Sequence, residues 1–210
     1  MTEYILSRSE AKALIHARPQ TDVYLLRSGT LYSVAVSYYD SLLTYSGRLT
    51  PDKEGLEDAH SKLYKRLPRF DLVVVEGWSI RLLPSGYTIS LSPSTKLSTL
   101  LKRLNALEAT PIGVDFADKV KRLDVEVGAS KPYYIMVAGS VFNPYLLKLG
   151  LRMLSRSLPA EARLIKRSNG TAIIHMFQRK GDGLDLGFFL APVYIPEPSS
   201  TDVMVVDVTY

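Results

Sequence analysis

The sequence contains no cysteine, which excludes disulfide bonds, thiolate chemistry and cysteine-ligated zinc. It has no apolar run of the roughly 18 residues that a membrane-spanning helix needs, and no signal-like apolar segment follows Met1, so we expect a soluble, cytoplasmic protein. The three histidines are too far apart along the chain to form a local zinc site. A glycine-rich phosphate loop and a Gly-x-Ser-x-Gly nucleophile turn are also missing. We therefore expect a binding protein more than an enzyme, with no cofactor and no metal.

Side-chain amides are scarce, with three Asn and two Gln among 210 residues. Asn, Gln and Cys are heat-labile, and their scarcity beside abundant Arg, Tyr, Val and Leu is typical of thermophilic proteins. We expect a thermophilic source, and an archaeal one.

Acidic residues are nearly absent from two segments of the chain, although the formal net charge is only +5. Residues 60–103 contain only Asp71 and Glu76 as acids, and residues 144–181 contain only Glu161. The basic residues of the first segment are Lys62, Lys65, Arg66, Arg69, Arg81, Lys96, Lys102 and Arg103. Those of the second are Lys148, Arg152, Arg156, Arg163, Lys166, Arg167, Arg179 and Lys180. Residues 182–210 have five acids and no Lys or Arg. Concentrated positive charge attracts polyanions, of which nucleic acid is the commonest.

Hydrophobic periodicity and turn residues predict helices and strands along the whole chain. Ser7 and Glu10 form a capping box, Pro51 is placed as a first helical residue, and Val114–Val127 is either a helix or a loop and a strand. The other expected helices begin at Ser94 or Thr95 and at Asn143-Pro144. The expected strands are Val23–Arg27, Leu31–Tyr39, Leu42–Arg48, Phe70–Val75, Ile80–Leu83, Tyr87–Leu91, Tyr133–Ala138, Ala162–Lys166, Thr171–Gln178, Leu184–Leu190 and Val203–Val208.

These elements predict an α+β fold, mostly antiparallel sheet with four or five packed helices. One helix followed by three strands occurs twice, at residues 7–49 and 143–191. The chain is therefore expected to form two similar lobes, residues 1–108 and 109–210, or a single domain. The likeness of the two units is either an internal repeat or the ordinary similarity of two antiparallel meanders, which we favour.

The order helix, three strands, helix at residues 7–67 resembles the topology of a double-stranded-RNA-binding domain. In that module a basic cluster at the start of the second helix contacts phosphate. The corresponding turn here is Pro51-Asp52-Lys53-Glu54, which is acidic. The resemblance is therefore one of topology only, and we do not transfer the function of that family.

The favoured function is non-catalytic binding of DNA or RNA through basic helix faces and neighbouring aromatic residues. Lys148, Arg152 and Arg156 are spaced i, i+4, i+8, which predicts a single basic row on the helix that begins at Asn143-Pro144. The expected nucleic-acid-binding residues are Lys62, Lys65, Arg66, Arg69, Lys102, Arg103, Lys148, Arg152, Arg156, Arg167 and Trp78.

Two other classes of function remain open. In the first, the protein is an assembly subunit of an intracellular or viral complex, and Val203–Val208 pairs with another copy of the chain to form a homo-oligomer. In the second, it is a metal-dependent nuclease that uses Asp71 and Glu76, or a nucleotidyl-transfer enzyme that uses Asp115, Asp118 and His175. The nuclease pattern lacks its lysine, because Trp78 follows Glu76-Gly77.

Overall fold

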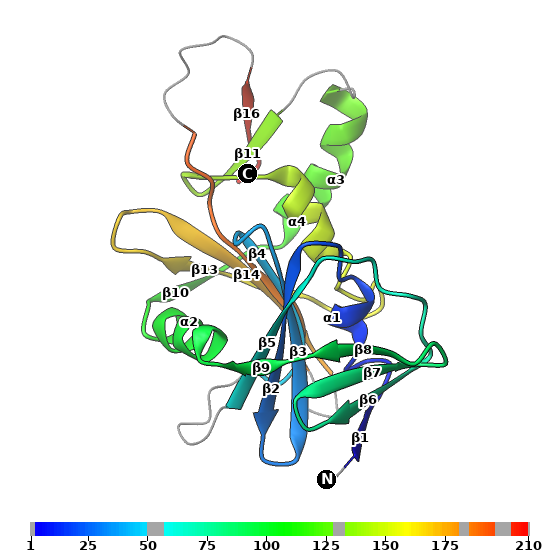
Figure 1. Ribbon diagram of the computed structural model, residues 1–210. Coiled ribbons are helices and arrows are strands. Elements are labelled where there is room, and N and C mark those ends of the chain that lie inside the picture. The colour runs from blue at the N-terminus through cyan, green and yellow to red at the C-terminus, as the bar shows by residue number, and fades with distance from the viewer. Residues whose placement is uncertain (1–2, 50–56, 128–132, 181–184, 196–202, 210) are drawn as a thin grey trace.

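β-strands dominate the computed structural model, which describes residues 3–49, 57–127, 133–180, 185–195 and 203–209 (Figure 1). The predicted α+β class with four or five packed helices is wrong: the protein is mostly β, with four short helices among the described residues. The helices are α1 (Lys12–Ile15), α2 (Lys96–Asn105), α3 (Asp115–Val127) and α4 (Pro144–Leu151). Several segments that the sequence pattern assigns to helices or loops are strands.

A nine-stranded antiparallel sheet forms the centre of the molecule, in the order β10-β13-β14-β15-β4-β3-β2-β5-β9. Its strands are β2 (Thr21–Ser28), β3 (Leu31–Tyr38), β4 (Leu42–Gly47), β5 (Glu57–Leu63), β9 (Ser92–Ser94), β10 (Ala109–Ile112), β13 (Glu161–Lys166), β14 (Ala172–Arg179) and β15 (Asp185–Leu190).

Two three-stranded meanders meet in the middle of this sheet. Strands β2, β3 and β4 form one and β13, β14 and β15 the other, and β4 pairs with β15 so that Leu42 faces Leu190. Each meander follows a helix, α1 or α4, and both helices pack on the same face of the sheet. The predicted order of helix and three strands is therefore observed twice, and strands from both predicted halves of the chain belong to one sheet.

The two faces of the nine-stranded sheet carry separate hydrophobic clusters. The larger one packs α1, α3 and α4 around residues such as Val36 and Phe188. The smaller one packs Leu97, Leu101 and Leu104 of α2 against the opposite face. Side chains alternate between the faces along each strand, so neighbouring residues contribute to different clusters.

Two smaller sheets complete the fold (Figure 1). One has the order β1-β6-β7-β8, with strands Glu3–Leu6, Leu72–Glu76, Ser79–Leu83 and Tyr87–Ser90. The other has the order β12-β11-β16, with strands Ser140–Phe142, Tyr133–Val137 and Met204–Asp207. Strand β16, from the segment predicted to pair with another copy, runs parallel to β11 of its own chain. Association of chains through Val203–Val208 stays a prediction.

The hydrogen bonds of two predicted capping residues are observed, but only Asn143 caps the helix it was assigned to, because α1 begins later, at Lys12, with Ala11 as an N-cap that makes no side-chain bond. The Ser7 amide donates to Glu10 Oε2 at 2.7 Å and the Glu10 amide donates to Ser7 Oγ at 3.2 Å, which is the reciprocal capping box. At α4, Asn143 Oδ1 accepts from the amides of Tyr145 and Leu146 at 2.9 and 3.4 Å. Pro144 follows at the first helical position.

The helix predicted from Thr50-Pro51 to Leu67 is wrong where it can be compared. Residues 50–56 lie outside the described residues, and Glu57–Leu63 is strand β5, paired with β2. Ala59 and Leu63 are four apart, a spacing compatible with both a helix and a strand, and both are buried on one face of the sheet. The sequence does not show the apolar pattern of a buried strand here, because Asp58 and His60, which point to the α2 face of the sheet, are polar. The second helix of the double-stranded-RNA-binding topology is therefore not present over these residues.

The N-terminus of α2 is capped from a distant strand. Of the two predicted cap residues, Thr95 makes no side-chain capping bond, and Ser94 Oγ accepts from the Lys96 amide at 3.2 Å. The buried carboxylate of Asp58 accepts from the Leu97 amide at 3.1 Å and from Ser98 Oγ at 3.5 Å. A carboxylate at this position satisfies amide groups that have no partner within the helix and interacts favourably with the helix dipole.

Replacement of Asp58 by Ala should destabilise the protein by about 1–3 kcal/mol, because it leaves the Leu97 amide without its acceptor. The measurement is the free energy of unfolding from urea denaturation. Glu108, an exposed acidic residue whose one ion pair within the described residues is a 3.9 Å surface contact with Lys166, is the control. Equal losses for Asp58→Ala and Glu108→Ala would contradict the capping role.

Candidate nucleic-acid interface

A hollow of about 890 Å³ lies between helix α1 and the segment that joins β5 to β6. One side consists of residues at and around α1, and the other of the connecting segment. Its lining residues are Arg8, Ile15, His16, Ala17, Arg18, Pro19, Arg66, Leu67, Pro68, Arg69, Phe70 and Asp71. We call this hollow the α1 groove.

The α1 groove is strongly cationic. Arg8, Arg18, Arg66 and Arg69 line it, and Asp71 is the only acid among its lining residues. All four guanidinium groups belong to exposed residues, and none forms an ion pair or a side-chain hydrogen bond within the described part of the chain. Their hydrogen-bond donors are therefore available to an external anion.

Positive charge from the second basic segment acts on the lining of the groove. His16 lies in the lining, and burial is the main cause that lowers its pKa from the ordinary value of 6.5, followed by the charges of Lys12, Arg152 and Arg18. Arg152 is the C-terminal cap residue of α4 and does not line the groove, but its charge acts on His16 in the lining.

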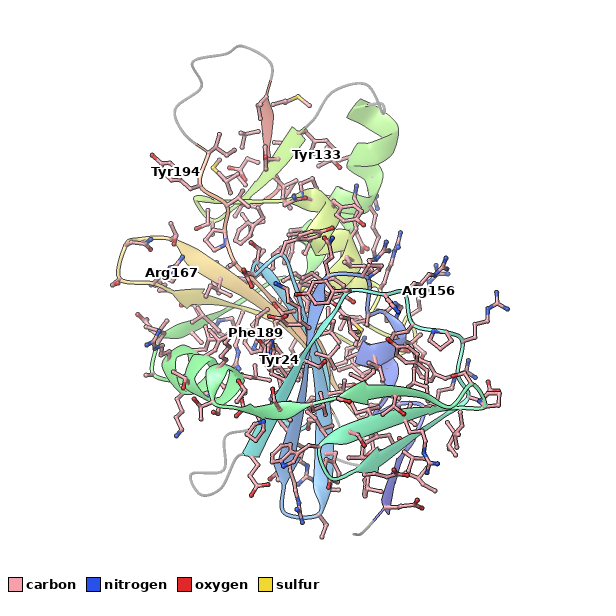
Figure 2. All side chains as sticks on the ribbon, in the orientation of Figure 1. Tyr24, Tyr133, Arg156, Arg167, Phe189 and Tyr194 are labelled. Carbon is pink, nitrogen blue, oxygen red and sulfur yellow. The ribbon has the colours of Figure 1, made fainter. Side chains whose placement is uncertain are left out.

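Hydrogen bonds hold two further basic residues of the second segment near α1. Lys180 Nζ donates to Ser9 Oγ at 3.0 Å, beside Arg8. The buried side chain of Gln178 accepts from the Ser155 amide at 2.6 Å and donates to the carbonyls of Ser155 and Leu158, which fixes the turn that carries Arg156. In Figure 2 Arg156 extends on the side of the molecule where α1 lies.

Apolar side chains lie among the arginines of the groove. Ile15 is 45% exposed and Phe70 is partly buried against the core. Leu67 and Pro68 extend this apolar strip between Arg66 and Arg69. Exposed apolar and aromatic surface beside guanidinium groups suits contact with the sugars and bases of a nucleic acid as well as its phosphates.

Several predicted binding residues lie elsewhere. Lys102 and Arg103 are exposed on α2, on the opposite face of the nine-stranded sheet. Arg167 is exposed at the end of β13, on the opposite side from Arg156 (Figure 2). Trp78 is 43% exposed at the β6–β7 turn, at the opposite end of β6 from Asp71. These four residues do not belong to the α1 groove.

The predicted basic helix faces also need correction. Lys62 is on strand β5, 5.8 Å from the ring centroid of Tyr64, and Lys65 is exposed in the following segment. Helix α4 ends at Leu151, so Arg156 lies beyond it and the three basic residues form no continuous helical row. Lys148 is half-buried and donates to Tyr133 Oη at 3.0 Å. The arginines that line the groove therefore come from the segments before and after α1 and from the segment that joins β5 to β6, and not from a basic helix face.

Sequence reasoning missed Arg8, Lys12 and Arg18, which lie outside both basic segments. One signal was present in the chain: between Arg8 and Arg18 the only acid is Glu10. Its carboxylate accepts from the Ser7 amide and from Tyr4 Oη, so it is occupied by local structure. The turn before α1 thus engages the one acid of this stretch, and Arg8 and Arg18 have no other acid close to them in sequence.

The residues considered for catalysis lie in separate places. Asp71 and Glu76 lie at opposite ends of β6, and Glu76 forms an ion pair with Arg81. Asp115 and Asp118 are exposed at the start of α3, and Asp118 pairs with Lys121 at 2.8 Å. His175 is buried on β14, facing α2. Among the described residues, no group of three or more His, Asp or Glu is placed to hold a metal ion.

Comparison with protein-family models and with curated proteins finds no match to this sequence. Within the described residues, no helix is long and apolar enough to cross a membrane. The functional argument therefore depends on the residues and their arrangement.

Proposed function

We propose that the protein binds nucleic acid in the α1 groove without catalysing a reaction. The observation that supports this most strongly is that Arg66 and Arg69, from the first basic segment, line one groove and form no ion pair within the described residues. Arg8 and Arg18 add to the same surface, and Asp71 alone opposes them in the lining. Such an excess of one sign attracts a polyanion and speeds its association.

The chemistry of the groove suits a phosphate backbone. Guanidinium groups donate paired hydrogen bonds to phosphate oxygens, and arginine is favoured over lysine at such contacts. Residues such as Ile15 and Phe70 provide apolar surface for sugars or exposed bases. The binding we propose is therefore electrostatic first, with weak dependence on base sequence.

The test is fluorescence anisotropy of the full chain with labelled single- and double-stranded DNA and RNA of mixed sequence. If about five phosphates are contacted, log K should fall with log salt concentration at a slope near −4 to −5. Failure to bind any of the four nucleic acids at low salt would refute the proposal.

Binding through the α1 groove should strengthen in mild acid. The pKa of His16 is lowered in the free protein, so its imidazole is neutral at pH 7. A bound polyanion favours the protonated imidazole, so binding takes up a proton and affinity rises as the pH falls toward this lowered pKa. Anisotropy titrations at pH 7.5 and 5.5 should show this rise, and the variant His16→Gln should show a smaller one. An equal pH dependence in both proteins would show that His16 does not contribute to the interface.

A further inference from the structure

A second polar pocket lies on the opposite face of the nine-stranded sheet from the α1 groove. It has a volume of about 450 Å³ and lies between α2 and strands β4, β13, β14 and β15. Its lining includes three arginines, Arg48, Arg163 and Arg179, together with the buried side chains of Tyr45 and His175. This size falls within the range of small-molecule sites.

A chain of hydrogen bonds orders the floor of this pocket. Arg163 Nε donates to His175 Nδ1 at 2.9 Å, and Tyr45 Oη lies 2.8 Å from His175 Nε2. Burial, followed by the charge of Arg163, lowers the pKa of His175 to about 3, so the imidazole is neutral. Because Nδ1 accepts from Arg163, the proton of the neutral ring is on Nε2, which donates to Tyr45 Oη. The Tyr45 hydroxyl hydrogen then has no acceptor among the described residues.

Close packing holds Tyr45 in this position. Gly187 is opposite Tyr45 in the pairing of β15 with β4. A Cβ atom at Gly187 would lie 2.6 Å from both Tyr45 Oη and the Met176 carbonyl oxygen, so a larger residue would displace the hydroxyl or the backbone. The polar floor is thus a fixed arrangement of buried groups.

The walls of the pocket combine positive charge with aromatic surface. The guanidinium groups of Arg163 and Arg179 lie 5.4 and 5.5 Å from the ring centroid of Phe177. The Phe189 ring stacks on His175 with centroids 3.9 Å apart. Asp185 opposes the arginines, but burial raises its pKa and so weakens its negative charge as the pH falls. Arg179 also pairs with Glu161 at 3.4 Å through exposed atoms, a contact that contributes little free energy.

We propose that this pocket binds a small organic phosphate monoester. The terminal nitrogen atoms of Arg163 can donate to the ligand, because the bond to His175 is made by Nε. Arg179 supplies a second guanidinium group at the mouth, and paired N–H donors match phosphate oxygens. The organic part of the ligand lies against Phe177 and Phe189. The site is independent of the nucleic-acid proposal, since the sheet separates it from the α1 groove.

The experiment is isothermal titration of the full chain with phenyl phosphate at pH 7, with inorganic phosphate and benzyl alcohol as partial ligands. Phenyl phosphate should bind at least about 10-fold more tightly than either partial ligand, because neither offers both the charge and the ring. Arg163→Gln and Arg179→Gln should each weaken phenyl phosphate binding by about 10-fold or more. Lys166→Gln, which removes an exposed charge from β13 outside the pocket, should leave it unchanged.

Thermal unfolding checks that each variant is folded. Should Arg163→Gln fail to fold, Arg179→Gln carries the test, since that side chain is 69% exposed. Binding that survives in the folded pocket variants, that is lost equally in Lys166→Gln, or that disappears on removal of Arg66 and Arg69 would overturn the proposal. Undetectable binding of phenyl phosphate at millimolar concentration, or equal binding of benzyl alcohol, would also overturn it.

Discussion

Replacement of both Arg66 and Arg69 by alanine is expected to weaken nucleic-acid binding by about 10- to 100-fold near 0.1 M salt. Each arginine that contacts a phosphate releases condensed counterions, and this release supplies most of the free energy of electrostatic binding. The salt dependence should change as well, with the slope of log K against log salt reduced in magnitude by about 2. Anisotropy titrations at four salt concentrations measure both quantities.

The matched control removes the same charge from another face. Lys102 and Arg103 are adjacent on α2, both are exposed, and neither lines the α1 groove. The variant Lys102→Ala/Arg103→Ala has the same net charge as the groove variant, so a general attraction to the whole protein would affect both equally. Equal losses of affinity and of salt slope in the two variants would reject the groove as the binding surface.

Acid is expected to destabilise the fold through His175. Its pKa is about 3 in the folded protein, against 6.5 for an unperturbed imidazole, so between about pH 6.5 and 3 the unfolded chain binds more protons than the folded protein. The contribution of His175 to the free energy of unfolding is therefore fully present above pH 6.5 and is lost as the pH falls toward 3. Between pH 7 and 4.5 the loss attributable to this residue should be about 2–3 kcal/mol.

The comparison that isolates this effect is urea unfolding of the wild type and His175→Gln across the same pH range. Carboxyl groups titrate in both proteins, so only the difference between the two pH profiles reports on His175. The variant should be less stable at pH 7, because it loses the stacked imidazole and its two hydrogen bonds, but it should lose less stability in acid. Parallel profiles would show that His175 does not have a lowered pKa.

Local patterns in the sequence predict those parts of the fold that local interactions determine. The capping residues Ser7 and Asn143 lie next to the turns they stabilise, and their bonds are observed. The leucine spacing of α2 predicts a helix with one apolar face, and Leu97, Leu101 and Leu104 are buried. The alternating pattern of residues 31–38 likewise marks β3.

Elements that depend on distant partners are beyond sequence reasoning. Strand β5 has few apolar residues because Asp58 serves α2, 39 residues further along the chain. The central pairing of β4 with β15 joins segments separated by more than 130 residues, and no local signal encodes it. The predicted fold class is wrong for this reason, since the sequence pattern assigns a polar strand to a helix.

The candidate interface was predicted in part. Charge counts identified Arg66 and Arg69, which line the α1 groove, and Arg152, whose charge helps to lower the pKa of His16 in that lining. The same counts could not separate these residues from Lys102, Arg103 and Arg167, because net charge along the chain says nothing about the face of a sheet. The contribution of Arg8 and Arg18 follows from the position of α1 across β3 and β4.

The central claim is that nucleic acid occupies the α1 groove, and ultraviolet cross-linking followed by peptide mapping tests it most directly. A complex with photoreactive oligonucleotide, formed at low salt, is irradiated and digested, and the attached peptides are identified by mass spectrometry. We predict cross-links in residues 8–19 and 64–71, with Phe70 and His16 as the nearest rings of the lining. Cross-links confined to α2 or to the turn that follows Arg167 would contradict the claim.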